Sequence, residues 1–213
     1  DLALGEDLDR PVAKLTDYLG RTVTIRYRDV LTQLALQPGV KIDPPGKDDI
    51  EKALQRVLDQ RILETPALEE AAAFGWQPAE KDIDKKVGEI VSFFPAPTDL
   101  TARLKLAGFH SLHDDDLGNV LARRLYIDGY LDVHFARDAR PTREIEDKYY
   151  HEVFVPEFRR RQTNVLVPSL EEARRQISDT LTRGRIAAEI ERHLIRARQR
   201  VRIEIVEAAL DGW

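Results

Sequence analysis

The sequence predicts a mainly α-helical protein with one small antiparallel sheet, and three observations carry this prediction. Apolar residues recur at helical spacing through most of the 213-residue chain. Near the N-terminus two β-prone runs, residues 12–16 and 22–26, flank a segment whose Gly20 suits a hairpin turn. A third run, residues 201–206, alternates with period two. We therefore expect the N-terminal hairpin and the C-terminal strand to share one sheet.

The longest predicted element is a helix that begins behind Pro168. Ser169 and Glu172 stand three residues apart, as in a capping box. Apolar residues then follow one helical face for about 30 residues, or roughly 45 Å at 1.5 Å per residue. A compact chain of this length has a radius of gyration of roughly 17 Å. We expect this helix to cross the molecule, and a truncation before it to unfold the N-terminal half.

Between these ends the pattern predicts a series of helices, for a total of roughly six to eight. The first starts at Asp29, directly after the second strand, and the next is capped by Asp48 with Glu51. Pro66 should kink or end that helix, because a proline inside a helix costs about 3 kcal/mol. The helical pattern resumes and stops at Gly75.

Four more helix starts follow along the chain, at Gln77-Pro78, Thr98, Asp114 and Thr142. The helix behind Asp114 should reach about residue 136. Pro156 is expected to stop the helix behind Thr142, which leaves residues 159–167 as a polar connector to the terminal helix.

Composition excludes several functional classes. The formal net charge is −5 and the charged fraction 33%, so no general affinity for nucleic acid or anionic membrane is expected. No apolar run is long enough to span a bilayer. Cysteine is absent, which excludes disulfides and thiol chemistry and fits an oxidising compartment. The chain starts at Asp1 with no visible signal peptide, so we expect a trimmed or mature form.

One cluster could bind a metal: His110 and His113 stand beside three aspartates, residues 114–116. The aspartates are better explained as a helix start, where carboxylates satisfy free N–H groups. No phosphate-binding glycine loop, zinc-protease motif or nucleophile elbow occurs. We therefore expect no cofactor, no metal and no enzymatic activity.

Two other groups of residues suggest binding. Arginines are dense from residue 183 to residue 202, but interleaved glutamates favour an ion-paired helix face over a nucleic-acid surface. Aromatic residues gather in the middle third, several beside prolines. Most should be core, but a subset could line an exposed groove for apolar peptide segments. The candidate substrate-binding residues are Phe93, Phe94, Phe109, Tyr126, Tyr130 and Phe135.

Several stretches, in this order, resemble the SurA-type periplasmic chaperones. Val12-Ala-Lys-Leu-Thr with Val23-Thr-Ile-Arg-Tyr-Arg-Asp-Val-Leu is similar to the opening strands and first helix of that family. Leu58-Asp-Gln-Arg-Ile-Leu and Gln77-Pro-Ala-Glu-Lys-Asp-Ile-Asp are similar to two later helices. Pro141-Thr-Arg-Glu-Ile-Glu-Asp-Lys-Tyr-Tyr is similar to the helix before the family's isomerase domain, and Val201-Arg-Ile-Glu-Ile to its last strand.

The chain departs from this family at one place. Relatives with prolyl isomerase activity carry a parvulin domain of roughly a hundred residues between the Tyr-Tyr helix and the terminal helix. Here only the connector, 159–167, fills that interval. The resemblance therefore implies a chaperone module without isomerase chemistry. The expected division is a loose arm at 1–10, a helical chaperone module at 11–158, the connector, and the terminal helix and strand at 168–213.

The resemblance implies an ATP-independent holdase in the periplasm that binds unfolded outer-membrane or secreted proteins through an apolar groove. It implies unfolded polypeptides as partners, with no nucleic acid and no membrane insertion, and leaves a homodimer open. Two alternatives remain: a peptidyl-prolyl cis-trans isomerase, and a helical protein that binds nucleic acid through its terminal arginines.

Overall fold

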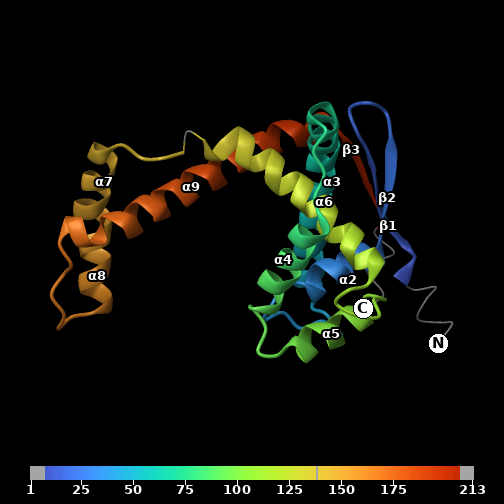
Figure 1. The fold of residues 1–213 in the computed structure, drawn as a ribbon, viewed down its shortest axis with the longest axis horizontal. Helices are drawn as coiled ribbons and strands as arrows, with labels where there is room; N and C mark the ends of the chain where they lie inside the picture. The colour runs from blue at the N-terminus through green and yellow to red at the C-terminus, as the bar shows by residue number, and fades with distance from the viewer. Residues whose placement is uncertain (1–7, 138, 207–213) are drawn as a thin grey trace. The chain divides into compact units, whose positions relative to one another are not determined.

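The structure, a computed structural model, describes residues 8–137 and 139–206. It is mainly helical with a small three-stranded antiparallel sheet, which confirms the predicted fold class (Figure 1). Residues 1–7 of the predicted N-terminal arm lie outside the described residues. The elements run in the order β1 (Pro11–Thr16), β2 (Thr22–Arg26), α2 (Tyr27–Ala35), α3 (Lys47–Phe74), α4 (Glu80–Val91), α5 (Pro97–Leu106), α6 (Asp115–Leu131), η1 (Asp132–Ala136), α7 (Arg143–Tyr149), η2 (Tyr150–Phe154), α8 (Val155–Arg161), α9 (Leu170–Arg198) and β3 (Arg202–Ile205).

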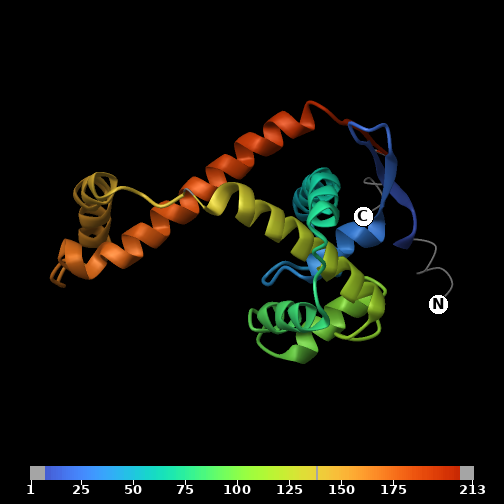
Figure 2. The same cartoon turned by 45° about the horizontal axis from the view of Figure 1, so that its top comes forward.

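The sheet joins both ends of the chain in the order β2-β1-β3. The central strand β1 pairs antiparallel with both neighbours, so that Leu15 lies opposite Val23 on one side and Ile203 on the other. Gly20 closes the hairpin in a left-handed conformation, with φ 79°. The strand at the chain end therefore finds the predicted partner, and Figures 1 and 2 both show β3 beside the hairpin.

Contacts divide the chain into two compact units. Unit 1 comprises Asp1–Tyr130 and Leu194–Trp213, and unit 2 comprises Leu131–His193. Helix α9 belongs to unit 2 through His193 and to unit 1 from Leu194 onward. This grouping does not test the division predicted from the sequence, into an arm, a helical module, a connector and a terminal helix, which stays a prediction.

The core of unit 1 lies where the sheet, α2, α3, α5 and α6 meet. Their inward faces carry fully buried aliphatic side chains, so hydrophobic burial is the main force holding this unit together. The largest of these are Leu15, Ile25, Leu34, Ile50, Leu100, Leu104, Leu117 and Leu121.

Helix α3 contradicts the expected break at Pro66, because it continues without interruption to Phe74. The missing N–H and the ring of a proline are costly inside a helix. Here apolar side chains are buried on both sides of the proline, Leu63 before it and Ala67 after it. Tertiary packing of both halves on the same core offsets the local cost. The helix ends at Gly75, as predicted, with φ 65°.

Unit 2 also departs from a sequence expectation, because Pro156 does not stop the helix behind Thr142. Helix α7 continues through a π-helical turn, η2, into α8 and ends at Arg161. The proline occupies the first turn of α8, and the wider π-turn directly before it accommodates a residue that cannot donate a helical hydrogen bond. The connector is correspondingly shorter than predicted.

The start of α9 follows the predicted capping box. The backbone N–H of Ser169 donates to Glu172 Oε2 at 2.7 Å, and the Glu172 N–H donates back to Ser169 Oγ at 3.4 Å. Across unit 2, Arg174 of α9 contacts Glu146 of α7 at 2.7 Å. The Arg174–Glu146 contact joins α9 to α7, and both views show the first turns of α9 beside the α7–α8 helix (Figures 1 and 2).

Candidate functional site

The six aromatic residues selected from the sequence lie in different environments. Phe93 is 69% exposed, whereas Phe109 is 5% exposed and is a core residue rather than a groove residue. Phe94 is half-buried, with its ring 5.7 Å from the Arg103 guanidinium carbon. Tyr126 packs edge-on against Trp76, with ring centroids 5.3 Å apart.

The last two of the six belong to different units. Tyr130 is half-buried in unit 1, where burial raises the pKa of its hydroxyl. Phe135 belongs to unit 2 and packs edge-on against His193 at 5.4 Å. None of the six lines the cavity that unit 2 holds. Their role in substrate binding stays a prediction.

Unit 2 instead holds a groove that the sequence reasoning did not identify. It is a cavity of about 470 Å³ between the α7–α8 helix, the connector and the first turns of α9. This volume lies within the range of roughly 300–1,000 Å³ that is usual for ligand pockets. We call it the unit 2 groove, and it is lined by Tyr149, Phe154, Glu157, Phe158, Arg161, Gln162, Pro168, Gln176, Ile177 and Thr180.

Aromatic side chains form the apolar wall of the groove. The lining rings of Phe154 and Phe158 lie 5.9 Å apart, and Tyr150, which does not itself line the groove, stacks on Phe154 with ring centroids 5.8 Å apart. The three rings stand four residues apart and therefore share one face of the continuous helix. The Tyr150 hydroxyl donates to the Pro168 carbonyl at 2.9 Å, which ties this wall to the start of α9.

The opposite wall and the rim of the groove contain both apolar and polar side chains. Ile177 is 1% exposed and forms the floor on the α9 side, while Gln176 and Thr180 add polar groups. At the rim Glu157 and Arg161 form an exposed ion pair at 3.5 Å. Such a pair contributes little to stability. The groove therefore combines an aromatic wall with polar groups that could contact a peptide backbone.

The connector beside the groove presents further apolar surface. Leu166 is 93% exposed and Val165 is 56% exposed, only two or three residues before the groove residue Pro168. Contiguous exposed apolar surface of this kind is typical of binding sites. The predicted polar character of this connector applies to its first half only.

The sequence does not predict the groove, because Pro156 indicates a helix stop. A helix that ended there would place Phe158 outside the regular spacing. The signal that could have revealed the wall is the spacing of four residues between Tyr150, Phe154 and Phe158. This spacing has structural meaning only if the helix passes through the proline, as it does.

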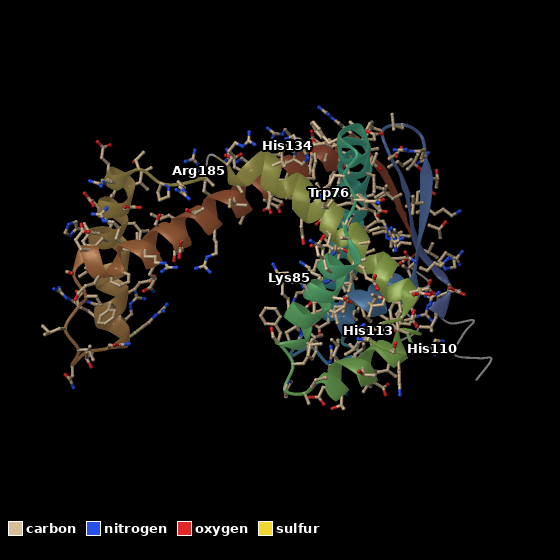
Figure 3. The ribbon with its side chains drawn as sticks, in the orientation of Figure 1. Trp76, Lys85, His110, His113, His134 and Arg185 are labelled. Carbon is tan, nitrogen blue, oxygen red and sulfur yellow. The ribbon has the colours of Figure 1, made fainter. Side chains whose placement is uncertain are left out.

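The histidine and aspartate cluster forms a helix cap. Asp114 Oδ1 accepts from the Asp116 N–H at 3.0 Å, and its Oδ2 accepts from the His110 N–H at 2.9 Å, which lowers the pKa of this carboxyl group. His110 and His113 are exposed (Figure 3). In the ranges that the structure describes, no cluster of three or more His, Asp or Glu residues could hold a metal ion.

The terminal arginines include several in ion pairs. Arg198 donates two hydrogen bonds to Asp59 at 2.9 and 2.7 Å, and Arg202 contacts Glu204 at 2.8 Å. Arg192 contacts Glu189, one turn away. Of these three, only Arg192 pairs along the predicted helix face, whereas Arg198 reaches α3 and Arg202 lies on β3. Among residues 8–137 and 139–206, no helix is both long enough and apolar enough to cross a membrane.

No protein-family model, curated protein or solved structure matches this chain. The likeness to SurA-type chaperones thus depends on the short sequence motifs alone.

Proposed function

We propose that this protein is an ATP-independent chaperone that holds extended apolar segments of unfolded polypeptides, and that the unit 2 groove is a binding site for them. The observation that carries the proposal is the groove itself, in which the rings of Tyr149, Phe154 and Phe158 face a cavity of about 470 Å³. The motif resemblance supports the same class of function, with the periplasm as the compartment and outer-membrane or secreted proteins as clients.

The groove has the physical properties that a holdase requires. Aromatic rings contribute large apolar area to contacts with many different side chains. Burying one client side chain of Leu or Phe size contributes about 1.5–3 kcal/mol before the costs of association. A groove of this size accepts few such side chains, so binding is weak and reversible. Weak binding to the unfolded state delays aggregation by mass action and needs no nucleotide.

Suppression of aggregation tests the proposal. A denatured outer-membrane β-barrel protein is diluted into buffer with increasing amounts of the full chain, and light scattering is recorded. The wild-type chain should suppress scattering at a few-fold molar excess. Phe154→Ala with Phe158→Ala should require about tenfold more protein, because a loss of about 1.4 kcal/mol in binding corresponds to a factor of ten.

The matched control is Phe74→Ala, which removes a ring that is 80% exposed in unit 1 and does not line the groove. Circular dichroism should show that all variants keep the wild-type helix content. No suppression by the wild-type chain would refute the chaperone proposal. Equal suppression by the wild-type chain and the double variant would show that the unit 2 groove is not the binding site.

Two assays address the alternatives. Isomerisation of a proline-containing peptide should stay at background, and clear catalysis would favour the isomerase. Binding to duplex DNA should be absent at 150 mM salt, since the acidic chain has a net charge of −5.

A further inference from the structure

The sheet of unit 1 has an open edge along β3. This strand pairs with β1 on one side, and among the described residues no other strand pairs with it (Figure 1). In the same part of the chain, β1 is also the one element against which β3 packs extensively. The free side of an edge strand presents backbone N–H and C=O groups with which another strand can pair.

The register of β3 determines which of its backbone groups point to the open edge. The Val206 N–H donates to the Val12 carbonyl at 2.9 Å. Bonded and non-bonded positions alternate along an antiparallel pair, so the even-numbered residues of β3 bond to β1. The N–H and C=O groups of Ile203 and Ile205 therefore point away from β1. Among the described residues, no backbone hydrogen bond from outside the sheet reaches these groups.

The same two residues carry apolar side chains that the core does not cover. Ile203 lies opposite Leu15 and Ile205 lies opposite Ala13, so all four side chains share the face of the sheet that packs on the core. Leu15 and Ala13 are buried, whereas Ile203 is half-buried and Ile205 is 49% exposed. The core thus covers the centre of the sheet and stops short of its β3 margin.

The opposite edge, along β2, is less suited to a further strand. Its core-side residue Ile25 is fully buried, and its pairing with β1 is irregular between Pro11 and Ala13. The Arg26 N–H at the end of β2 already donates to Asp29 at 2.8 Å. By contrast, β3 lacks three devices that protect sheet edges, because its register is continuous, it contains no proline and its charged side chains lie on the outer face.

We propose that the β3 edge binds an extended segment of an unfolded polypeptide, which adds to the three-stranded sheet as a further antiparallel strand. The client residues opposite Ile203 and Ile205 exchange N–H···O bonds with them and place their side chains on the core side of the sheet. This inference rests on the proposed function for the identity of the client. It adds a second site, in unit 1, that recognises the client backbone.

The site selects a client by the pattern of its side chains. Because side chains alternate between the two faces of a strand, the client residues that bond to β3 must be apolar and the intervening residues polar. On the outer face, Glu204 lies opposite Lys14 and 2.8 Å from Arg202, so these three residues carry a net positive charge. A segment that alternates aliphatic residues with neutral or acidic ones fits this edge. Since β3 is short, binding is weak and reversible, as a holdase requires.

A labelled peptide tests the site directly. The probe is fluorescein-labelled Glu-Ile-Thr-Val-Glu-Ile-Thr-Val-Glu, and its fluorescence anisotropy is recorded as the full chain is added. N-methylation of the aliphatic residues removes the donors that face β3 and should weaken binding about tenfold. N-methylation of the Thr and Glu residues changes N–H groups that face away from β3 and should leave the affinity within about twofold.

Amide hydrogen exchange of the full chain, followed by NMR, locates the added strand. The N–H groups of Ile203 and Ile205 should exchange about fivefold more slowly when the probe is bound. The N–H groups of Thr22 and Thr24 face the β2 edge by the same alternation, and their exchange should not change.

Two variants form a matched pair. Ile205→Lys places a charge on the core side of the open edge and should weaken probe binding about tenfold. Val23→Lys makes the same change at the β2 margin of the same face, where Val23 is 40% exposed, and should bind the probe as the wild type does. Should Ile205→Lys fail to fold, the N-methylated probes and hydrogen exchange decide with the wild-type chain.

Several results would overturn the proposal. These are no binding by the wild-type chain, equal binding of the probe and both N-methylated forms, or slower exchange at Thr22 and Thr24 in place of Ile203 and Ile205. Binding by a chain that ends at Val206 but not by the full chain would assign the edge to the chain's own residues 207–213. A wild-type dimer that Ile205→Lys dissociates, without probe binding, would assign the edge to a second copy.

The double variant Phe154→Ala with Phe158→Ala separates this inference from the proposed function, because it changes unit 2 alone. It should bind the probe with the same sensitivity to N-methylation as the wild type. Suppression of aggregation without probe binding would refute the β3 site alone. Probe binding without suppression of aggregation would refute the chaperone proposal and leave β3 as a peptide-binding edge.

Discussion

Arg103 should be one of the most important polar residues for the stability of unit 1. Helix α2 ends without a basic residue in its last turn, and α5 supplies one from a distant part of the sequence. The Arg103 guanidinium donates four hydrogen bonds to backbone carbonyls around that helix end, at 2.7 to 3.0 Å. The acceptors are the carbonyl oxygens of Leu34, Ala35, Gln37 and Val40.

The size of the effect follows from these contacts. A hydrogen bond from a charged donor is worth about 1.5–3 kcal/mol, but water replaces part of the set when the side chain is removed. Arg103 is partly buried, and burial lowers the pKa of its guanidinium. We therefore expect Arg103→Met to lower the free energy of unfolding by about 3 kcal/mol. For a unit of this size that corresponds to a fall in Tm of roughly 6–12 °C.

Urea unfolding followed by circular dichroism measures the change, and three variants give a graded test. Arg103→Lys keeps the charge but loses the planar arrangement of donors, so its loss should lie between those of the wild type and Arg103→Met. Lys105→Met removes an exposed positive charge from the same helix and should change stability by less than about 0.5 kcal/mol. If Arg103→Met costs no more than Lys105→Met, the proposed capping of α2 by α5 is wrong.

Three further changes test other parts of the fold. Asp114→Ala should cost about 1 kcal/mol at pH 7, because it removes an N-cap. The His110 N–H lowers the pKa of the Asp114 carboxyl from its ordinary value of 3.8. The difference in unfolding free energy between the wild type and Asp114→Ala should therefore be full above pH 3.8 and disappear as the pH falls through the lower pKa of the folded state. Urea unfolding at a series of acidic pH values measures this difference. Pro66→Ala should raise stability by about 2 kcal/mol in the same urea assay, since it restores a helical hydrogen bond inside α3. A chain ending at Val167 lacks β3 and Arg198 and should lose cooperative thermal unfolding of unit 1; a retained sharp transition would contradict the role of the chain end.

The sequence alone determined those features that depend on local chemistry. The capping box of Ser169 with Glu172, the hairpin with Gly20 and the helix end at Gly75 follow from short-range rules. The predicted cap of Asp48 with Glu51 is wrong, because α3 already begins at Lys47, behind Gly46, with no side-chain cap. The pairing of β3 with the hairpin was also predictable, because a single strand at the chain end needs a partner and the hairpin is the other β-prone segment.

The two proline positions show where local rules fail. Pro66 and Pro156 each carry the usual local cost of a proline in a helix, yet both helices continue. At Pro66 burial on both sides outweighs the cost, and at Pro156 a π-helical turn accommodates it. Neither packing against distant segments nor a local change of helix type is visible in a single-sequence pattern.

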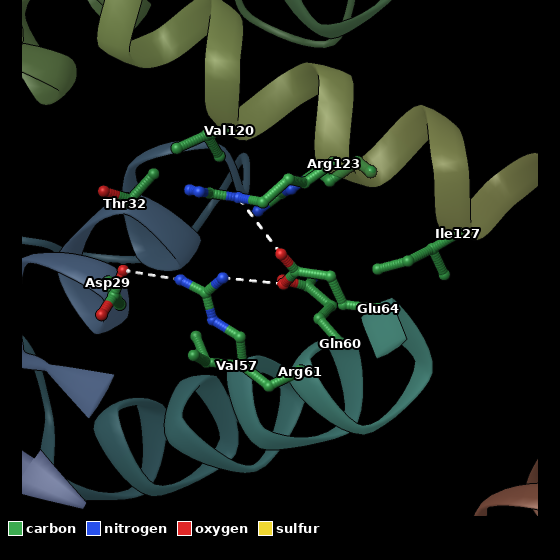
Figure 4. Close-up of a pocket in the computed structure, with 10 residues that line it drawn as sticks. Asp29, Thr32, Val57, Gln60, Arg61, Glu64, Val120, Arg123 and Ile127 are labelled. Atoms are coloured by element: carbon green, nitrogen blue, oxygen red, sulfur yellow. Dashed lines mark hydrogen bonds and ion pairs between the residues drawn. The ribbon is translucent and has the colours of Figure 1, made fainter. Parts of the chain in front are cut away.

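The binding sites depend on tertiary structure even more. The aromatic wall of the unit 2 groove exists only because the helix passes through Pro156, and its floor, Ile177, comes from another helix. In unit 1, Arg61 of α3 contacts Asp29 of α2 at 3.4 Å, although their separation in sequence gives no sign that they meet (Figure 4). Sequence determined which segments are helical and where most of them begin. Only the packing of distant segments decided which side chains are buried together, because burial depends on contacts that are formed across the chain.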